Sequence, residues 1–543
     1  MIKEKVLRKI KPKLPVLAII FFTLLAYVNA LKDSFVWDDH YVIVANDFIR
    51  SWHNLHLIFS RAYFESFVEL TYRPVVTLSY FLDYSIWKLN PLGLHLDSVL
   101  LHAFNAVLFF SFLNLVFKKK APALFAALLF ALHPVNSEAV SVISFRDDLL
   151  AFMFFFSSFI LYIKSTSRPG SFRISGCYIL SLALFVFALF SKEMAVTLPL
   201  FLALYDHLFD GNKKAYSLLK RFKLYYLGYF LITLFYLCVR FIFMENPAAA
   251  KVVYPGGNFY TNILTMSRVF AHYLYLAFFP ARAHLILHGN SFISGSFFNP
   301  GTLFSVLLIA ACFIFALWVK NRSKVIFFSF ALFFVALIPV ANIIPIPNFA
   351  ANRYLYIPIT GFCLFLSAAI FQLPRVKSPF FARMQKSFLF CAMAAILIFY
   401  AAFTAIRNIS YRSDAYLWSE MVEAYPDSFE AHSWLGWVYL SQGLFDQAIR
   451  EYEAAINLTP KGAKTEDYFY LGLSYRGRGM LEEAIASFNK AIALGYQKKK
   501  AYYYLGLIFK SKGSFGQAKQ SFEEAIKIDR GFVEARNELE RLK

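Results

Sequence analysis

Residues 302–319 read TLFSVLLIAACFIFALWV, a run without a charged side chain, and the basic residues Lys320, Arg322 and Lys324 follow it. A helix that spans a bilayer needs about 20 mostly apolar residues. The run therefore predicts a transmembrane helix, and the basic residues behind it indicate its cytoplasmic end.

Ten further runs of this kind precede residue 410, which makes eleven predicted spans. They cover residues 14–31, 96–117, 121–137, 148–164, 174–191, 194–210, 222–244, 302–319, 325–341, 353–371 and 387–406. Lys and Arg collect at the N-terminus and in residues 118–120, 164–173, 213–223, 320–324 and 375–386. Placing all of these in the cytoplasm gives an all-α membrane helix bundle with its N-terminus inside and its C-terminus outside.

Two parts of this topology have alternatives. Residues 261–290 begin as an apolar stretch but contain Arg268, and a crossing there would put the basic residues 320–324 outside. We therefore expect this segment to lie in the interface or to dip into the membrane and return. Residues 1–30 also resemble a cleaved signal peptide, because Val-Asn-Ala at 28–30 imitates a cleavage site.

The composition also indicates a membrane protein. The 543 residues are 59% apolar and only 16% charged, whereas globular proteins average ~25% charged residues. An ordinary soluble enzyme could not bury so many apolar side chains. The net charge of +21 does not indicate nucleic-acid binding, because residues 411–543 hold equal numbers of basic and acidic side chains. The five cysteines lie inside apolar runs, which predicts neither a disulfide framework nor a zinc site.

A repeated pattern occupies the C-terminal part. Leu435-Gly436-x-x-Tyr439 returns as Leu471-Gly472-x-x-Tyr475 and as Leu505-Gly506-x-x-Phe509, with spacings of 36 and 34 residues. The pattern resembles the tetratricopeptide repeat (TPR), a helix–turn–helix unit of 34 residues. We predict a transmembrane domain at 1–408 and a repeat domain at 409–543, with repeats at about 429–462, 465–498 and 499–532 and a capping helix at 532–543. Such repeats bind extended peptides, but they also serve as spacers or dimer surfaces.

Charged residues in the predicted outer loops are candidates for a functional site. A charge close to a bilayer costs free energy, so a protein that retains one there usually needs it for function. The loop 32–95 contains Asp38-Asp39 beside Trp37, and later Arg73. A carboxylate there can take a proton from a hydroxyl, or help to hold a divalent cation. The alternative is a solvated loop, since Asp-Asp pairs also occur by chance.

A second group of candidates surrounds the third predicted span. It consists of His133, Glu138, Arg146, Asp147 and Asp148. Pro134 should break the helix near its outer end, which would aim His133 and Glu138 at a cavity. The alternative is a capping acid on the next helix with an interfacial Arg–Asp pair.

The last outer candidates are Lys192-Glu193 and Arg353. An Arg suits a phosphate, because its planar fork binds two oxygens at once. The alternatives are a charge pair that links helix ends and an Arg that snorkels to the headgroups. No phosphate-binding glycine loop, His-Glu-x-x-His motif or nucleophile elbow occurs in the sequence. The set therefore favours a lipid-linked phosphate that enters sideways at one membrane face.

Together these stretches resemble the TMTC family, the transmembrane and TPR-containing O-mannosyltransferases of the GT-C glycosyltransferase superfamily. The resemblance lies in the repeats and in Phe35-Val36-Trp37-Asp38-Asp39, Tyr72-Arg73-Pro74, His133-Pro134-Val135-Asn136-Ser137-Glu138-Ala139-Val140, Arg146-x-Asp148-Leu149-Leu150, Lys192-Glu193 and Arg353-x-Leu355-Tyr356-x-Pro358. It implies transfer of a mannose-like hexose from a polyprenyl-phosphate donor to a hydroxyl, such as that of a protein Ser or Thr, on the non-cytoplasmic face.

The resemblance also implies roles for individual residues. Asp38 becomes the catalytic base with Asp39 beside it; Arg146, Lys192 and Arg353 become candidates for the donor phosphate, and His133 and Glu138 for the sugar pocket. The chain departs from the family in having only about three repeats and two adjacent acids at 147–148. The short repeat array leaves the acceptor open.

Two other functions remain open, a polysaccharide polymerase or O-oligosaccharide ligase, and a non-enzymatic membrane scaffold that displays the repeats. Polymerases and ligases usually carry a large late outer loop, whereas the charge clusters here come early. We expect a multi-pass protein of a bacterial inner membrane whose repeats face the periplasm. Its expected partners are a lipid-linked sugar and a protein acceptor, without nucleic acid, and the one cofactor that we consider is a divalent cation.

Overall fold

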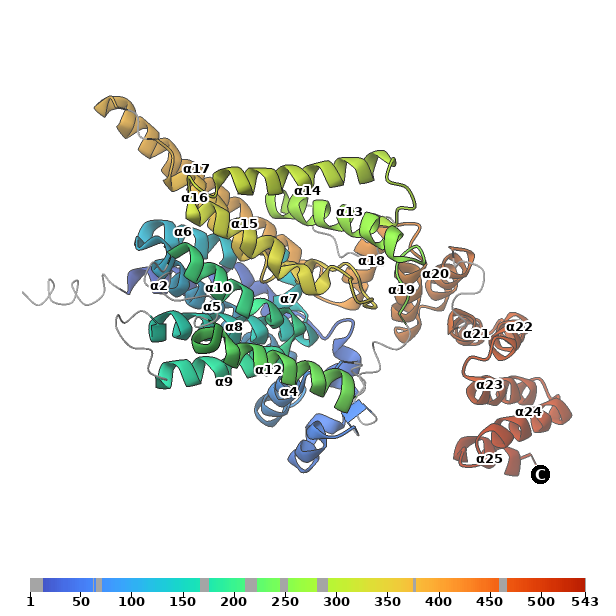
Figure 1. The fold of residues 1–543 in the computed structure, drawn as a ribbon. Coiled ribbons are helices and arrows are strands. Elements are labelled where there is room, and N and C mark those ends of the chain that lie inside the picture. The colour runs from blue at the N-terminus through green and yellow to red at the C-terminus, as the bar shows by residue number, and fades with distance from the viewer. Residues whose placement is uncertain are drawn as a thin grey trace, which may run out of the picture. The chain divides into compact units, whose positions relative to one another are not determined.

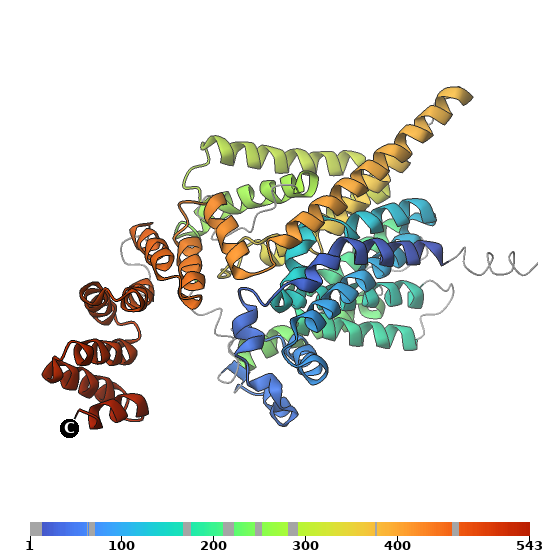
Figure 2. The same cartoon turned by 180° about the vertical axis from the view of Figure 1, so that it is seen from behind.

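The computed structural model describes residues 13–61, 63–64, 71–166, 175–209, 222–244, 252–280, 292–374, 377–458 and 466–542, which form helices and turns. The chain separates into two compact units, Met1–Ser413 and Asp414–Lys543. Figures 1 and 2 show both units from opposite sides. The predicted all-α fold is confirmed.

The first unit is a bundle of helices of very different lengths (Figure 1). Its helices are α2 (Leu14–Tyr27), α4 (Pro74–Trp87), α5 (Pro91–Phe117), α6 (Lys120–Ala131), α7 (Ser137–Ser141), α8 (Arg146–Thr166), α9 (Gly176–Ser191), α10 (Leu198–Phe209), α12 (Leu227–Cys238), α13 (Phe259–Phe278), α14 (Pro300–Val319), α15 (Lys324–Ala336), α16 (Ile359–Phe371) and α17 (Pro379–Ile409).

Six helical segments within the described residues are long and apolar enough to cross a membrane. They are Leu14–Lys32, Pro91–Phe117, Ile143–Thr166, Phe222–Phe243, Pro300–Val319 and Pro379–Ile409. A seventh candidate is the pair Lys120–Ala131 and Pro134–Ser141, which bends by 46° at the predicted proline break. Each of the eleven predicted runs contains a helix, so a polytopic membrane bundle is confirmed, while the count of eleven spans stays a prediction.

Apolar side chains on the outside of the bundle have the pattern that lipid requires. On α14, Phe304 and Leu317 expose 64% and 66% of their surface, and on α17 Phe388 and Phe390 expose 72% and 67%. A water-facing surface would not carry large side chains of this kind along whole helices. We infer that these faces contact the hydrocarbon of the bilayer.

Helix α13 contains the described part of the segment that we expected to dip in and return; residues 281–291 lie outside the described residues. Its first turns lie beside the 342–352 loop, where the Asn342 amide donates a hydrogen bond of 2.7 Å to Asn262. Later in the chain, the Ser294 N–H donates to the Thr265 hydroxyl at 3.2 Å. Ser294 therefore lies beside the first half of α13, and α14 begins shortly afterwards beside the same helix (Figure 1). That this segment does not cross the membrane stays a prediction.

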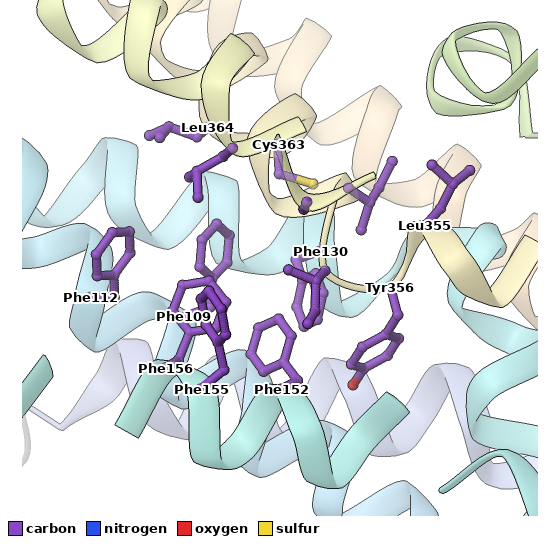
Figure 3. Close-up of a cluster of buried hydrophobic side chains, with 14 of the residues drawn as sticks. Phe109, Phe112, Phe130, Phe152, Phe155, Phe156, Leu355, Tyr356, Cys363 and Leu364 are labelled. Atoms are coloured by element: carbon purple, nitrogen blue, oxygen red, sulfur yellow. The ribbon is translucent and has the colours of Figure 1, made fainter. Parts of the chain in front are cut away.

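An aromatic core holds the residues that follow Arg353 in place. Figure 3 shows Tyr356 and Phe152 packed beside Phe130, and the Phe130 and Phe152 rings lie 4.9 Å apart. The Tyr356 hydroxyl and the Nδ1 atom of His102 form a buried hydrogen bond of 2.7 Å. Lipid is as apolar as these rings, so moving them from lipid into the core gains no hydrophobic free energy. Close packing and internal hydrogen bonds therefore stabilise such a core.

The second unit contains the predicted repeats. Its helices are α18 (Asp414–Ala424), α19 (Phe429–Ser441), α20 (Phe445–Leu458), α21 (Glu466–Arg478), α22 (Leu481–Ala493), α23 (Lys498–Ser511), α24 (Phe515–Ile528) and α25 (Val533–Glu540). In each pair a glycine of the first helix faces an aromatic ring of the second: Gly436 faces Tyr452, Gly472 faces Phe488 and Gly506 faces Phe522. A Cβ at Gly472 would lie 2.9 Å from the ring, so the small residue permits the two helices to approach closely.

Candidate active site

Most of the charged residues that we selected from separate loops lie together at one end of the helix bundle. Arg73 precedes α4, Asp147 and Asp148 lie in the first turn of α8, and Lys192 and Glu193 join α9 to the next 3-10 turn. The sequence predicted only that these residues share one face of the membrane. In the structure their side chains contact one another directly.

The centre of the group is a buried set of ion pairs. The Lys192 ammonium lies 2.5 Å from an Asp148 carboxylate oxygen and 3.2 Å from Asp147, and these three side chains are at most 3% exposed. Arg73 reaches the same Asp147 oxygen at 2.7 Å. Burial lowers the pKa of Lys192, but Asp147 and Asp148 outweigh it and raise the pKa overall. Lys192 is therefore a fixed cation.

Glu193 connects this set of ion pairs to Arg240, a residue that we did not select from the sequence. Its carboxylate lies 3.4 Å from Arg73 and 3.2 Å from Arg240, and Arg240 also donates to the Tyr236 hydroxyl at 2.6 Å. Burial raises the pKa of Glu193, but the two arginines outweigh it and hold the pKa below its ordinary value. The sequence did contain a signal for Arg240, because it lies inside the apolar run 222–244. An arginine in a membrane is costly unless a negatively charged group pairs with it.

Arg353 and Glu138 form a separate buried pair beside the first group. The Nη1 atom of Arg353 donates to Glu138 at 2.8 Å, and the guanidinium carbon lies 3.8 Å from the centroid of the Phe145 ring. This is the one hydrogen bond found for the Arg353 side chain among the described residues. The second Glu138 oxygen is buried without a hydrogen-bond partner among them. Both side chains thus retain groups that can bind a ligand.

The two adjacent aspartates differ in their surroundings. The buried Asp39 carboxylate accepts the Ser144 N–H at 2.7 Å and the Val36 N–H at 3.2 Å. The Asp38 side chain is half-buried, and within the described part of the chain no hydrogen bond or ion pair to its carboxylate is found. Burial raises the pKa of Asp39 to about 6 despite these hydrogen bonds. Asp39 thus fixes the loop, while Asp38 keeps its oxygens available.

Electrostatic neighbours tune Asp38. Burial raises the pKa of its carboxyl, Arg353 acts in the opposite direction, and the charges of Asp147 and Glu138 add to the rise. A carboxylate with a raised pKa is a stronger proton acceptor than an ordinary surface aspartate. Asp38 is therefore a candidate for a general base.

Two of the predicted residues lie in other surroundings. Arg146 forms a buried ion pair with Asp83 on α4, and its guanidinium also donates to the Leu94 carbonyl at 3.1 Å. The ring nitrogens of His133 contact the Ala277 carbonyl at 3.2 Å and the Val135 N–H at 3.3 Å, and its ring packs on Tyr400. Both side chains have partners within the protein, and their contacts with a donor phosphate and a sugar stay predictions.

The group combines cations with carboxylates that pair with them. The described residues contain no group of three or more His, Cys, Asp or Glu side chains that could hold a metal ion. Arg73, Lys192 and Arg353 each carry donors that bind phosphate oxygens. These features define the class: a polytopic membrane protein with a buried polar site at one end of its bundle, followed by TPR helices.

Comparisons with known proteins agree with this class. Models of the tetratricopeptide repeat match residues 429–461, 468–494 and 499–532. Over 82% of its length the chain is 25% identical to protein O-mannosyl-transferase F38B6.6 of Caenorhabditis elegans. Over 80% it is 27% identical to protein O-mannosyl-transferase tmtc2 of Xenopus laevis. The resemblance to the TMTC proteins is confirmed.

The likeness is strongest over a shorter part and does not extend to whole proteins. The chain is 32% identical to human protein O-mannosyl-transferase TMTC1 over 203 residues, 35% of its own length. It spans about three fifths of the first two relatives, 62% and 61% of their lengths. Among solved structures, that of the APC/C hetero-tetramer Cut9-Hcn1 covers 86% of the chain at 13% identity and a TM-score of 0.24, a likeness too weak to inform the fold.

Proposed function

We propose that this protein is an integral-membrane glycosyltransferase of the GT-C type. It transfers a mannose-like hexose from a polyprenyl-phosphate donor to a hydroxyl, such as that of a protein Ser or Thr. The reaction takes place on the non-cytoplasmic face, and the repeats recruit the acceptor. The names of the relatives support a mannosyl transfer to proteins, and the site supports the donor class and the base.

The observation that carries the proposal is the contrast between Asp38 and every other acid of the site. Asp39, Asp147, Asp148, Glu138 and Glu193 are each engaged by an N–H group or a cation. Asp38 lies among them, close enough to interact with the Arg353 charge, with its oxygens uncommitted among the described residues. A general base needs such an accessible lone pair within reach of the hydroxyl that it deprotonates.

The donor phosphate is assigned to Arg353, with Lys192 and Arg73 behind it. Arg353 has a guanidinium nitrogen left beyond its bond to Glu138. Its guanidinium carbon lies 3.8 Å from the centroid of the Phe145 ring. Asp38 and Asp147 interact with its charge, without a hydrogen bond to it within the described residues. Arg73 and Lys192 are shared among Asp147, Asp148 and Glu193. They contribute positive potential, whereas Arg353 can donate directly to an oxygen.

The chemistry is a single displacement with inversion at the anomeric carbon. The acceptor oxygen forms a bond to that carbon as the bond from the carbon to the phosphate oxygen breaks. The electron pair of the broken bond leaves with the polyprenyl phosphate, and Asp38 takes the hydroxyl proton. A phosphate leaving group needs no protonating acid, so one base suffices, unlike glycoside hydrolysis, which uses two carboxylates.

The test measures transfer of radiolabelled mannose from polyprenyl-phosphate mannose to protein acceptors in membranes that contain the full chain. We expect the Asp38→Asn variant to lose about 10²–10⁴-fold in rate, the usual contribution of a general base. The control variant is Asp47→Asn in the same loop, where the side chain is 85% exposed and pairs with Arg50. It should retain wild-type activity.

Two results would overturn the proposal. If wild-type membranes transfer no label from polyprenyl-phosphate mannose, the proposed donor is wrong. If Asp38→Asn transfers label as fast as wild type, the assignment of the base is wrong even though the activity stands.

A further inference from the structure

The turn that carries Asp38 and Asp39 has an unusual backbone. The Asp39 N–H donates to the Val36 carbonyl at 3.0 Å, which closes a tight turn over residues 36–39. Trp37, the second residue of this turn, has a φ of +53°. Only glycine adopts this region freely, and a bulky residue there is a true outlier.

Two of the other positive-φ residues in the described chain have ordinary explanations. Lys118 follows the last residue of α5 in the left-handed region, where such C-terminal caps are common. Asn342 is of the residue type that tolerates this conformation. Trp37 has neither explanation, although glycine or asparagine would form the same turn without strain. Strain that persists at a site indicates that the side chain itself is needed.

The Trp37 ring lies beside Phe145 and the proposed phosphate ligand Arg353. It meets the Phe145 ring edge-on with centroids 5.2 Å apart, and the Arg353 guanidinium carbon lies 5.9 Å from its centroid. The side chain is half-buried, as is Asp38 next to it. The ring thus neighbours the proposed phosphate ligand, and its residue directly precedes the proposed base in the chain.

We infer that Trp37 is a sugar-binding residue whose indole face packs against the apolar C–H face of the pyranose in the donor. This inference rests on the proposed function and adds a specificity residue to it. The strained turn serves two purposes at once: it directs the Asp39 carboxylate to the Ser144 and Val36 amides and leaves the indole beside Asp38. Pockets for polar ligands use such aromatic faces together with a few placed polar groups.

The experiment compares two lipids that differ only in the sugar. Native mass spectrometry of the purified full chain in micelles measures the dissociation constants of polyprenyl-phosphate mannose and of polyprenyl phosphate. We expect Trp37→Leu to weaken binding of the mannosylated lipid about tenfold, the effect of losing one packed aromatic face. Binding of the sugar-free lipid should not change, and Trp37→Tyr, which retains a ring, should bind both lipids nearly as wild type does.

The matched control is Trp52→Leu. Trp52 lies in the same loop, is 45% exposed and donates to Ser85 at 2.8 Å, away from Asp38. It should bind both lipids as wild type does. Because Trp37→Gly removes both the ring and the strain, it should lose the sugar preference without a fall in melting temperature, which separates binding from folding.

Each other result rejects the inference. If Trp37→Leu keeps the wild-type preference for the mannosylated lipid, the sugar does not contact the ring. If it weakens both lipids equally, Trp37 only anchors the loop at the membrane interface. If the wild-type chain binds neither lipid, the proposed function fails and the inference fails with it.

Discussion

Ion pairs differ sharply between the helix bundle and the repeats. Lys192, Asp147 and Asp148 expose at most 3% of their side chains. In the repeats, Arg478 and Asp446 pair at 2.7 Å with 56% and 58% exposed. Burying two charges costs desolvation free energy that their mutual attraction often does not offset. An exposed ion pair changes the free energy of unfolding by little in either direction. The difference teaches that the buried pairs are costly to form and that the repeat pairs are incidental to stability. We therefore assign a chemical role to the buried set as part of the proposal.

Removing Lys192, the cation at the centre of the buried set, should have the largest effect on stability and activity. Lys192→Met leaves Asp148 buried without its ammonium partner at 2.5 Å, and one-sided removal of a buried pair costs about 3–5 kcal/mol. SDS-induced unfolding in mixed micelles measures the loss. Transfer activity should disappear in the same variant.

A double variant sharpens this prediction. Lys192→Met with Asp148→Leu removes both partners, so it should recover much of the free energy of unfolding while staying inactive. A double variant that is both stable and active would show that the pair has no role in the chemistry.

Packing in the repeats gives the next largest effect. A Cβ at Gly506 would lie 2.5 Å from the buried Phe522 ring, whereas nothing lies within 4 Å of one at Gly516. Gly506→Ala should destabilise the repeat unit by about 1–3 kcal/mol through overpacking. Gly516→Ala should stabilise it by about 0.5–1 kcal/mol, because alanine loses less entropy in a helix. Thermal unfolding of the full chain, followed by circular dichroism, distinguishes the two; equal effects would contradict the close helix approach.

Acids in the two units should also respond differently to pH. Burial raises the pKa of Asp38, while a hydrogen bond from Lys510 lowers the pKa of Glu538 in the repeats. Because Asp38 acts in its ionised form, transfer should fall about tenfold per pH unit below its pKa. The midpoint should lie above the ordinary Asp value of about 3.9. An acid limb centred at or below that value, in a pH–rate profile, would argue against a buried base.

The smallest effect belongs to the exposed pair. Arg478→Ala should change the free energy of unfolding by about 0–1 kcal/mol, and transfer activity should not change. Thermal unfolding at low and high salt measures this. A loss comparable to that of Lys192→Met would remove the distinction between the two units.

The sequence predicted the repeat unit in detail because its signal is local. The Gly positions 436, 472 and 506 recur at nearly one period, and each faces an aromatic ring in the fold. That residues 261–290 do not cross the membrane stays a prediction, which rests on the basic residues 320–324. Both inferences use information that lies along the chain.

The site was predicted only in part, because its partners come from distant segments. Lys192 and Asp148 were both selected, but nothing in the sequence specifies that they pair across 44 residues. Arg240 was missed because it lies within an apolar run, and Arg146 was expected near the donor although Asp83 holds it. The different surroundings of Asp38 and Asp39 depend on the Ser144 amide, which no sequence pattern places beside them.

The division of roles between Asp38 and Asp39 is the central claim, and one paired measurement tests it. Transfer rate and free energy of unfolding are measured for Asp38→Asn and for Asp39→Asn. We predict that Asp38→Asn loses about 10²–10⁴-fold in rate with unchanged stability. Asp39→Asn should lower the free energy of unfolding by about 1–3 kcal/mol, because the Ser144 or the Val36 N–H then faces an amide NH₂ group instead of a carboxylate oxygen. The folded fraction of this variant should stay active. The reverse pattern, an inactive Asp39→Asn and an active Asp38→Asn, would contradict the account.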